Sequence, residues 1–132
     1  MRALSIFAAF FFVLLPPALA GSEGVSEAPS ITASDLHERR ASGAAPVVID
    51  VRTAEEYATG HIPGALNIPF DEVAQRIAEI DAPHGVALYC MVGPRARKGE
   101  AALLSAGYDR VLHIEGGLAA WQAAGLPVEG DQ

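Results

Sequence analysis

The chain is poor in cysteine, in basic residues and in long apolar stretches, and each shortage excludes a class of protein. Its 132 residues include one cysteine, and 9 Lys and Arg stand against 16 Asp and Glu, which gives a net charge of −7. One cysteine cannot form an internal disulfide. An acidic surface repels nucleic acid and anionic membranes, because both carry negative charge. We therefore expect no nucleic-acid partner and no disulfide within the fold.

Ligand patterns for a metal ion or a nucleotide are also missing. One cysteine cannot make a structural zinc site, and the four histidines lack the spacing of metal ligands. These histidines are His37, His61, His84 and His113. No glycine-rich nucleotide loop occurs in the sequence. We therefore expect neither a metal nor a cofactor.

The main apolar run lies at the N-terminus, from Ala3 to Leu15, behind Arg2. It is shorter than the about 20 residues that span a bilayer. The small residues Ala18 and Ala20 make the pattern that signal peptidases cleave. We predict that residues 1–20 are a secretory signal peptide and that the protein is exported, to the periplasm of a bacterium, without stable membrane insertion. An uncleaved membrane anchor is the alternative.

The remainder reads as one domain behind a short leader. Residues 21–29 are small, polar and acidic, which predicts a flexible leader, and residues 30–132 form the predicted domain. Predicted strands alternate with helices, and this alternation indicates an α/β fold with a parallel sheet covered by helices on both faces. The predicted strands are 30–32, 47–49, 66–68, 86–89 and 111–114, and the predicted helices start near 33, 53, 71, 95 and 118.

Cys90 occupies the position of a candidate nucleophile. It follows the apolar run 86–89 and precedes the turn 91–94 and the predicted helix from Arg95. In parallel sheets, ligands bind at the carboxyl ends of strands. The unpaired amides of a helix start stabilise a thiolate, which is the reactive form of cysteine. The alternative is a buried thiol that only fills space, as most free cysteines do.

Basic residues gather directly after this cysteine. Arg95, Arg97 and Lys98 fall in the first turns of the predicted helix, where cations oppose the helix dipole. Helix stability therefore does not explain them. In an acidic chain they favour the binding of an anion, and an ordinary solvated charge run is the alternative.

Three segments together closely resemble the rhodanese-like domain family. They are residues 48–69, the loop from Cys90 to Arg95, and residues 106–128 with Glu115-Gly116-Gly117-Leu118 and Trp121. The resemblance covers essentially all of residues 30–129. It implies a three-layer α/β/α fold with a five-stranded parallel sheet. With the predicted signal peptide, the chain resembles an exported single-domain rhodanese.

The resemblance also implies a sulfurtransferase mechanism. Cys90 would take sulfur from a donor such as thiosulfate or a persulfide, carry it as a persulfide, and pass it to cyanide, a thiol or a protein. Arg95 would bind the oxyanion part of the donor. Other implied substrate-binding residues are Met91, Val92, Gly93 and Ala96, and the implied supporting framework is Asp50 and Arg52. The oligomeric state stays open.

The length of the cysteine loop separates two branches of this fold. Sulfurtransferases resemble Cys-x4-Arg, whereas the related phosphatases use the longer Cys-x5-Arg loop. Arg95 follows Cys90 by the shorter spacing and residue 96 is alanine, so the loop favours sulfur chemistry over phosphate.

Two loop residues depart from the family pattern. Met91 replaces a basic residue, and Pro94 has no N–H to donate to a sulfur anion. A catalytically weak binding or sulfur-carrier module is therefore the alternative to an enzyme.

Overall fold

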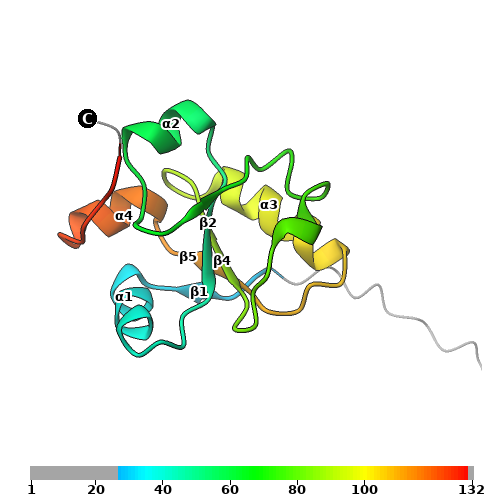
Figure 1. The fold of residues 1–132 in the computed structure, drawn as a ribbon, viewed down its shortest axis with the longest axis horizontal. Helices are drawn as coiled ribbons and strands as arrows, with labels where there is room; N and C mark the ends of the chain where they lie inside the picture. Colours follow the sequence, from blue (N-terminus) through cyan, green and yellow to red (C-terminus); the bar gives the residue numbers. More distant parts are fainter. Residues whose placement is uncertain (1–26, 131–132) are drawn as a thin grey trace, which may run out of the picture.

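The computed structural model describes residues 27–130, and these form a parallel sheet with helices on both faces (Figure 1). The predicted signal peptide and most of the predicted leader lie outside the described residues. The strands are β1 (Ser30–Ile31), β2 (Val47–Asp50), β3 (Leu66–Asn67), β4 (Val86–Tyr89) and β5 (Val111–Ile114). The helices are α1 (Ala33–Ala41), α2 (Ala54–Thr59), α3 (Pro94–Ser105) and α4 (Gly117–Ala123), with a 3-10 turn, η1 (Ile77–Glu79).

The five strands are parallel and lie in the order β1-β5-β4-β2-β3, which confirms the predicted fold class. β4 is central and wholly buried, as expected of an apolar strand covered on both faces. Its neighbours are β2, with Asp50 beside Tyr89, and β5, with His113 beside Leu88. The carboxyl ends of β2 and β4 therefore lie side by side.

Two apolar clusters cover the two faces of the sheet. One joins α3, through Ala96 and Leu103, to Val86 and Leu88 of β4. The other joins α1 and α4, through Leu36 and Trp121, to the opposite face of the sheet. Figure 1 shows α3 on one side of the sheet and α1 with α4 on the other.

The predicted helix over residues 71–80 is wrong. This segment consists of turns that end in η1, and its amides bond three residues back, for example Glu79 N to Arg76 O at 3.0 Å. The spacing of apolar residues still indicated burial correctly, because Val73 is buried and Ile77 packs against the core. Apolar periodicity reports which side chains face the core, and it does not distinguish a helix from successive turns over a short span.

The ordered contacts begin two residues before the predicted domain start. Ala28 is buried, and Pro29 O accepts a hydrogen bond from His113 N at 2.8 Å. Ala28 O also accepts a hydrogen bond from Arg97. Residues 28 and 29 therefore pack on the domain. Among residues 27–130, no helix has both the length and the apolar character needed to cross a bilayer.

Candidate functional site

Cys90 lies between the end of β4 and the start of α3, where the sequence predicted it. Its side chain is 2% exposed, and the backbone amide of Gly93 donates to Sγ over 3.1 Å. Pro94 is the first residue of α3, so a proline ring occupies the position of the next possible donor. The sulfur thus accepts a hydrogen bond from one backbone N–H at the amino end of a helix.

The start of α4 fixes the backbone of this loop from behind. Leu118 N donates to Cys90 O at 2.9 Å, and Ala119 N donates to Met91 O at 3.0 Å. Gly117 makes this approach possible: its φ is +58°, and a Cβ there would lie 2.7 Å from Met91 O. The two loop carbonyls are therefore held by α4. This contact gives a physical reason for the glycine pair Gly116-Gly117.

Arg95 is held by a carboxylate that the sequence analysis did not connect with the loop. Its two terminal nitrogens donate to the two carboxylate oxygens of Glu56 at 2.6 and 2.9 Å. The hydrogen bonds from Arg95 lower the pKa of Glu56 to about 2. Glu56 also belongs to the first turn of α2, where its amide bonds to the side chain of Thr53. Glu56 lies 39 residues from Arg95 in the sequence, so no local pattern connects the two side chains.

Asp50 and Arg52 form a buried ion pair at the carboxyl end of β2. Arg52 Nη2 donates to Asp50 Oδ2 at 2.7 Å and to Gly60 O at 2.6 Å. The Arg52 guanidinium also lies 5.8 Å from the ring centre of Tyr89, and burial raises the pKa of Tyr89. These contacts connect β2 to the end of α2 and to β4. They place Asp50 and Arg52 in the framework beside the loop.

The remaining predicted substrate-binding residues divide by exposure. Met91 is 39% exposed and Val92 is 61% exposed, whereas Gly93 and Ala96 are buried. Because the Ala96 side chain belongs to the core, this residue could reach a ligand only through its backbone. We call Met91, Val92, Arg95 and Glu56 the mouth of the Cys90 loop.

The basic residues after Cys90 do not converge on one anion site. Arg97 donates to Ala28 O and to Glu100, and Lys98 lies 5.4 Å from the ring centre of Phe70. The expectation of a three-residue anion cluster was therefore wrong. Each of the three cations contacts a different partner, Arg95 with Glu56, Arg97 with Ala28 and Glu100, and Lys98 with Phe70, so proximity in sequence does not bring their charges together.

A second pair of side chains, a glutamate with a histidine, lies buried beneath the loop. Glu100 Oε2 of α3 and His113 Nδ1 of β5 are 2.7 Å apart, and a Cβ on Gly93 would lie 3.7 Å from the far edge of the His113 ring. Burial raises the pKa of Glu100, and the hydrogen bond with His113 opposes that shift. We call Glu100 and His113 the floor of the Cys90 loop.

The floor could have been found from helical spacing. The buried residues of α3 include Ala96, Gly99, Glu100 and Leu103, which is the i, i+3, i+4, i+7 pattern of an apolar face. A glutamate on such a face needs a buried partner. The histidine of β5 is that partner.

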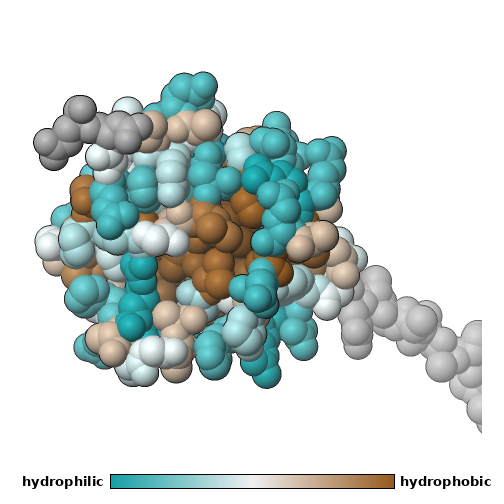
Figure 2. All heavy atoms as spheres, in the orientation of Figure 1, coloured by the Kyte–Doolittle hydropathy of each residue, from teal (hydrophilic) through white to brown (hydrophobic). Residues whose placement is uncertain are grey.

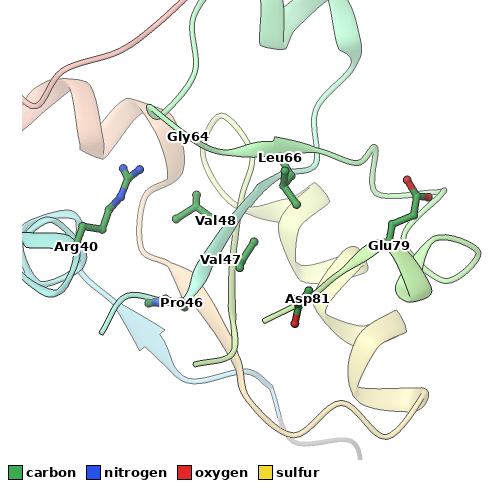
Figure 3. Close-up of a pocket in the computed structure, with 8 residues that line it drawn as sticks. All are labelled: Arg40, Pro46, Val47, Val48, Gly64, Leu66, Glu79 and Asp81. Carbon is green, nitrogen blue, oxygen red and sulfur yellow. The ribbon is translucent and has the colours of Figure 1, made fainter. Parts of the chain in front are cut away.

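A hollow elsewhere on the surface carries no comparable chemistry. It lies beside the start of β2, whereas Cys90 follows the carboxyl end of β4 (Figure 3). Figure 2 shows hydrophobic residues exposed in the middle of this face, with hydrophilic residues around them. The hollow is lined by Arg40, Pro46, Val47, Val48, Gly64, Leu66, Glu79 and Asp81. It contains no cysteine, serine or histidine that could act as a nucleophile. Within residues 27–130, no three His, Cys, Asp or Glu side chains are grouped to hold a metal ion.

Comparisons with known proteins agree with this geometry. Residues 32–124 match the model of the rhodanese-like domain. A sulfurtransferase of Allochromatium vinosum is 38% identical over 98 residues, which are 74% of this chain and 92% of that protein. An HTH-type transcriptional regulator of Mycobacterium tuberculosis is 39% identical over 101 residues, which are 76% of this chain and 44% of that protein. A crystal structure of thiosulfate sulfurtransferase from Pseudomonas aeruginosa matches with a TM-score of 0.72 and 32% identity, over 80% of this chain and 21% of that one.

Proposed function

Because the chain belongs to the rhodanese-like domain family, we propose that it transfers a sulfane sulfur through a persulfide on Cys90. The observation that carries this proposal is the position of Sγ at the end of β4, with the Gly93 amide donating to it at 3.1 Å. That position gives a candidate nucleophile a hydrogen-bond donor that can hold negative charge on a transferred sulfur.

The reaction needs two displacement steps and no external oxidant. In the first, the Cys90 thiolate attacks the outer sulfur of a thiosulfate or persulfide donor, and the donor's sulfur–sulfur bond breaks. Its electron pair leaves with sulfite or with a thiolate. In the second, cyanide or a thiolate attacks the outer sulfur of the Cys90 persulfide, and Cys90 leaves as a thiolate. The product is thiocyanate or a new persulfide.

Each part of the loop has a task in these steps. The Gly93 amide holds the charge that moves between the inner and outer sulfur atoms. The hydrogen bonds from Leu118 and Ala119 to the loop carbonyls keep that amide in place. Arg95 binds an oxyanion of the donor when its guanidinium is released from Glu56. The buried ion pair of Asp50 and Arg52 supports the end of β2 beside the loop.

Intact-mass measurement tests the proposal directly. After incubation with thiosulfate, or with an alkyl persulfide, the protein gains one sulfur atom, about 32 Da, and cyanide removes it. Cys90→Ser shows no gain with either donor. A wild-type protein that stays unchanged in mass with both donors overturns the proposal.

A role as a binding module is the second candidate, and two observations favour it. One relative is a transcriptional regulator, of which this chain spans 44%. Pro94 also leaves the sulfur with one donor fewer than an unsubstituted amide would supply. A module of this kind keeps its fold but takes up no sulfur, so the same mass measurement on folded protein separates the two roles.

Export is a further part of the proposal. Residues 1–20 have the charge, apolar run and small residues of a signal peptide. N-terminal sequencing of the protein from a cell-free periplasmic extract should then read Gly21 as the first residue, within a residue or two. A soluble protein that retains Met1 contradicts export by this route.

A further inference from the structure

The only arginine at the mouth of the Cys90 loop is already neutralised. Among the described residues, Glu56 binds both terminal nitrogens of Arg95, at 2.6 and 2.9 Å. Both side chains are about one-third exposed, so the pair sits at the surface where a donor would arrive. Since Arg95 also holds the pKa of Glu56 at about 2, the carboxylate stays ionised at neutral pH.

The rest of the mouth is apolar. Met91 and Val92 are among the few large apolar side chains that the described residues expose, and they directly follow Cys90. Arg97 and Lys98, the next cations along the chain, have their own contacts at Ala28, Glu100 and Phe70. The chain as a whole carries a net charge of −7. Little at the mouth therefore attracts a dianion.

We propose that Glu56 and the Met91–Val92 rim select a small alkyl persulfide of low charge as the sulfur donor, in preference to thiosulfate. This inference rests on the proposed function. Thiosulfate carries two negative charges and would have to compete with Glu56 for the Arg95 guanidinium. An alkyl persulfide needs no guanidinium, and the carbon next to its sulfur can pack against Val92.

The persulfide reaction balances without a co-reactant. The Cys90 thiolate attacks the terminal sulfur of R–S–SH and forms Cys90–S–SH. The sulfur–sulfur bond of the donor breaks, and R–S⁻ leaves with the electron pair. The leaving thiolate departs past the apolar rim, so no oxyanion needs to be stabilised at Arg95.

Single-turnover kinetics on the full mature chain test this selection. The two donors are thiosulfate and the persulfide of N-acetylcysteine methyl ester, which carries no charge apart from its sulfur. The readout is the rate of sulfur gain on Cys90 by intact mass. For the wild type we expect a larger second-order rate constant with the persulfide than with thiosulfate.

Glu56→Gln supplies the decisive variant, and Glu55→Gln is its matched control. Both remove one negative charge from the first turn of α2, but Glu55 is exposed and makes no contact with Arg95 in the described structure. We expect Glu56→Gln to raise the thiosulfate rate constant by up to about fivefold, the size of an exposed ion pair, and to change the persulfide rate constant far less. Glu55→Gln should alter neither donor's rate measurably.

Val92→Thr tests the apolar rim with a side chain of the same shape. It should lower the persulfide rate constant by a larger factor than the thiosulfate rate constant, because the persulfide makes more apolar contact there. Circular dichroism and thermal unfolding of each variant establish that the fold is kept.

The outcomes separate this inference from the proposed function. If neither donor adds sulfur to Cys90, the proposed function fails. If Cys90 gains sulfur but thiosulfate is the faster donor, the donor selection is overturned and sulfur transfer stands. A thiosulfate rate that is unchanged in Glu56→Gln, or that rises equally in Glu55→Gln, also overturns the role of Glu56.

Discussion

Two pairs of side chains flank the Cys90 loop, and each contains a glutamate. One pair lies at the mouth and the other at the floor, and they differ mainly in how far their side chains are exposed to solvent. At the mouth, Glu56 and Arg95 are both about one-third exposed. At the floor, Glu100 and His113 are buried, with Nδ1 and Oε2 2.7 Å apart. Water screens the first pair, so it can change the local charge while contributing little to stability. The second pair is buried and lacks such screening, and removing Glu100 leaves His113 without a partner in the core.

This difference in exposure suits the two pairs to different roles. In the proposed selection of donors, the Glu56–Arg95 ion pair at the mouth competes with the donor for Arg95. The floor lies next to the loop, because the His113 ring is 3.7 Å from the position that a Cβ on Gly93 would take, and the Gly93 amide donates to Cys90 Sγ.

Removing a side chain of the floor should cause the largest loss in the free energy of unfolding. Glu100→Ala leaves His113 without its partner and opens space in the core, so it should lower the free energy of unfolding by about 3–5 kcal/mol. Urea denaturation of variant and wild type measures this loss. The control is Glu72→Ala, whose surface pair with Arg76 is 3.8 Å long and should cost less than about 1 kcal/mol. Equal losses for the two variants would mean that the floor is no more important than a surface pair.

The second-largest effect should come from Gly117, at the contact between the start of α4 and the Cys90 loop. In Gly117→Ala, the new Cβ would press against the carbonyl oxygens of Cys90 and Met91, and we expect a loss of about 1–3 kcal/mol and slower sulfur uptake by Cys90. Gly125→Ala is the matched control. Gly125 has a similar positive φ of +72° but nothing within 4 Å of its Cβ position. Backbone strain alone would affect both variants equally in unfolding measurements, whereas a clash with the loop also slows sulfur uptake in Gly117→Ala only.

Much of the fold could be predicted because it depends on local patterns. The runs 47–49 and 86–89 are apolar enough to be buried strands in any parallel sheet, and each lies where the structure has β2 and β4. Threonines 32 and 53 cap α1 and α2, which begin close to the helix starts predicted near 33 and 53. The segment 71–80 was misjudged because its buried side chains repeat like those of a helix while its hydrogen bonds are those of turns.

The candidate site was predictable only in part, for a related reason. Cys90 could be placed because it lies at a boundary between a strand and a helix, which local sequence reveals. Glu56 lies 39 residues from Arg95, so only the folded sheet brings them together. No local pattern in the sequence pairs His113 with Glu100, although the spacing along α3 places Glu100 on the buried face.

The smallest expected effect is the pH dependence of the mouth. Hydrogen bonding to Arg95 lowers the pKa of Glu56 from 4.5 to about 2 in the folded protein. A depressed pKa means that the pair stabilises the fold fully above about pH 4.5, and that this contribution disappears as the pH falls toward 2. Because the pair is one-third exposed, its contribution at neutral pH should stay below about 1 kcal/mol.

Urea denaturation of wild type and Glu56→Gln between pH 6 and pH 2.5, which are about the limits set by these pKa values, measures the contribution of the pair to the free energy of unfolding. The two proteins should differ at the upper end and converge at the lower end. Glu55→Gln should track the wild type throughout, since Glu55 lacks the Arg95 contact. A difference between wild type and Glu56→Gln that persists at the lowest pH would place the effect of Glu56 in the capping of α2, where Thr53 Oγ1 donates to Glu56 Oε1 at 3.3 Å, and would remove the ion pair as the feature that separates mouth from floor.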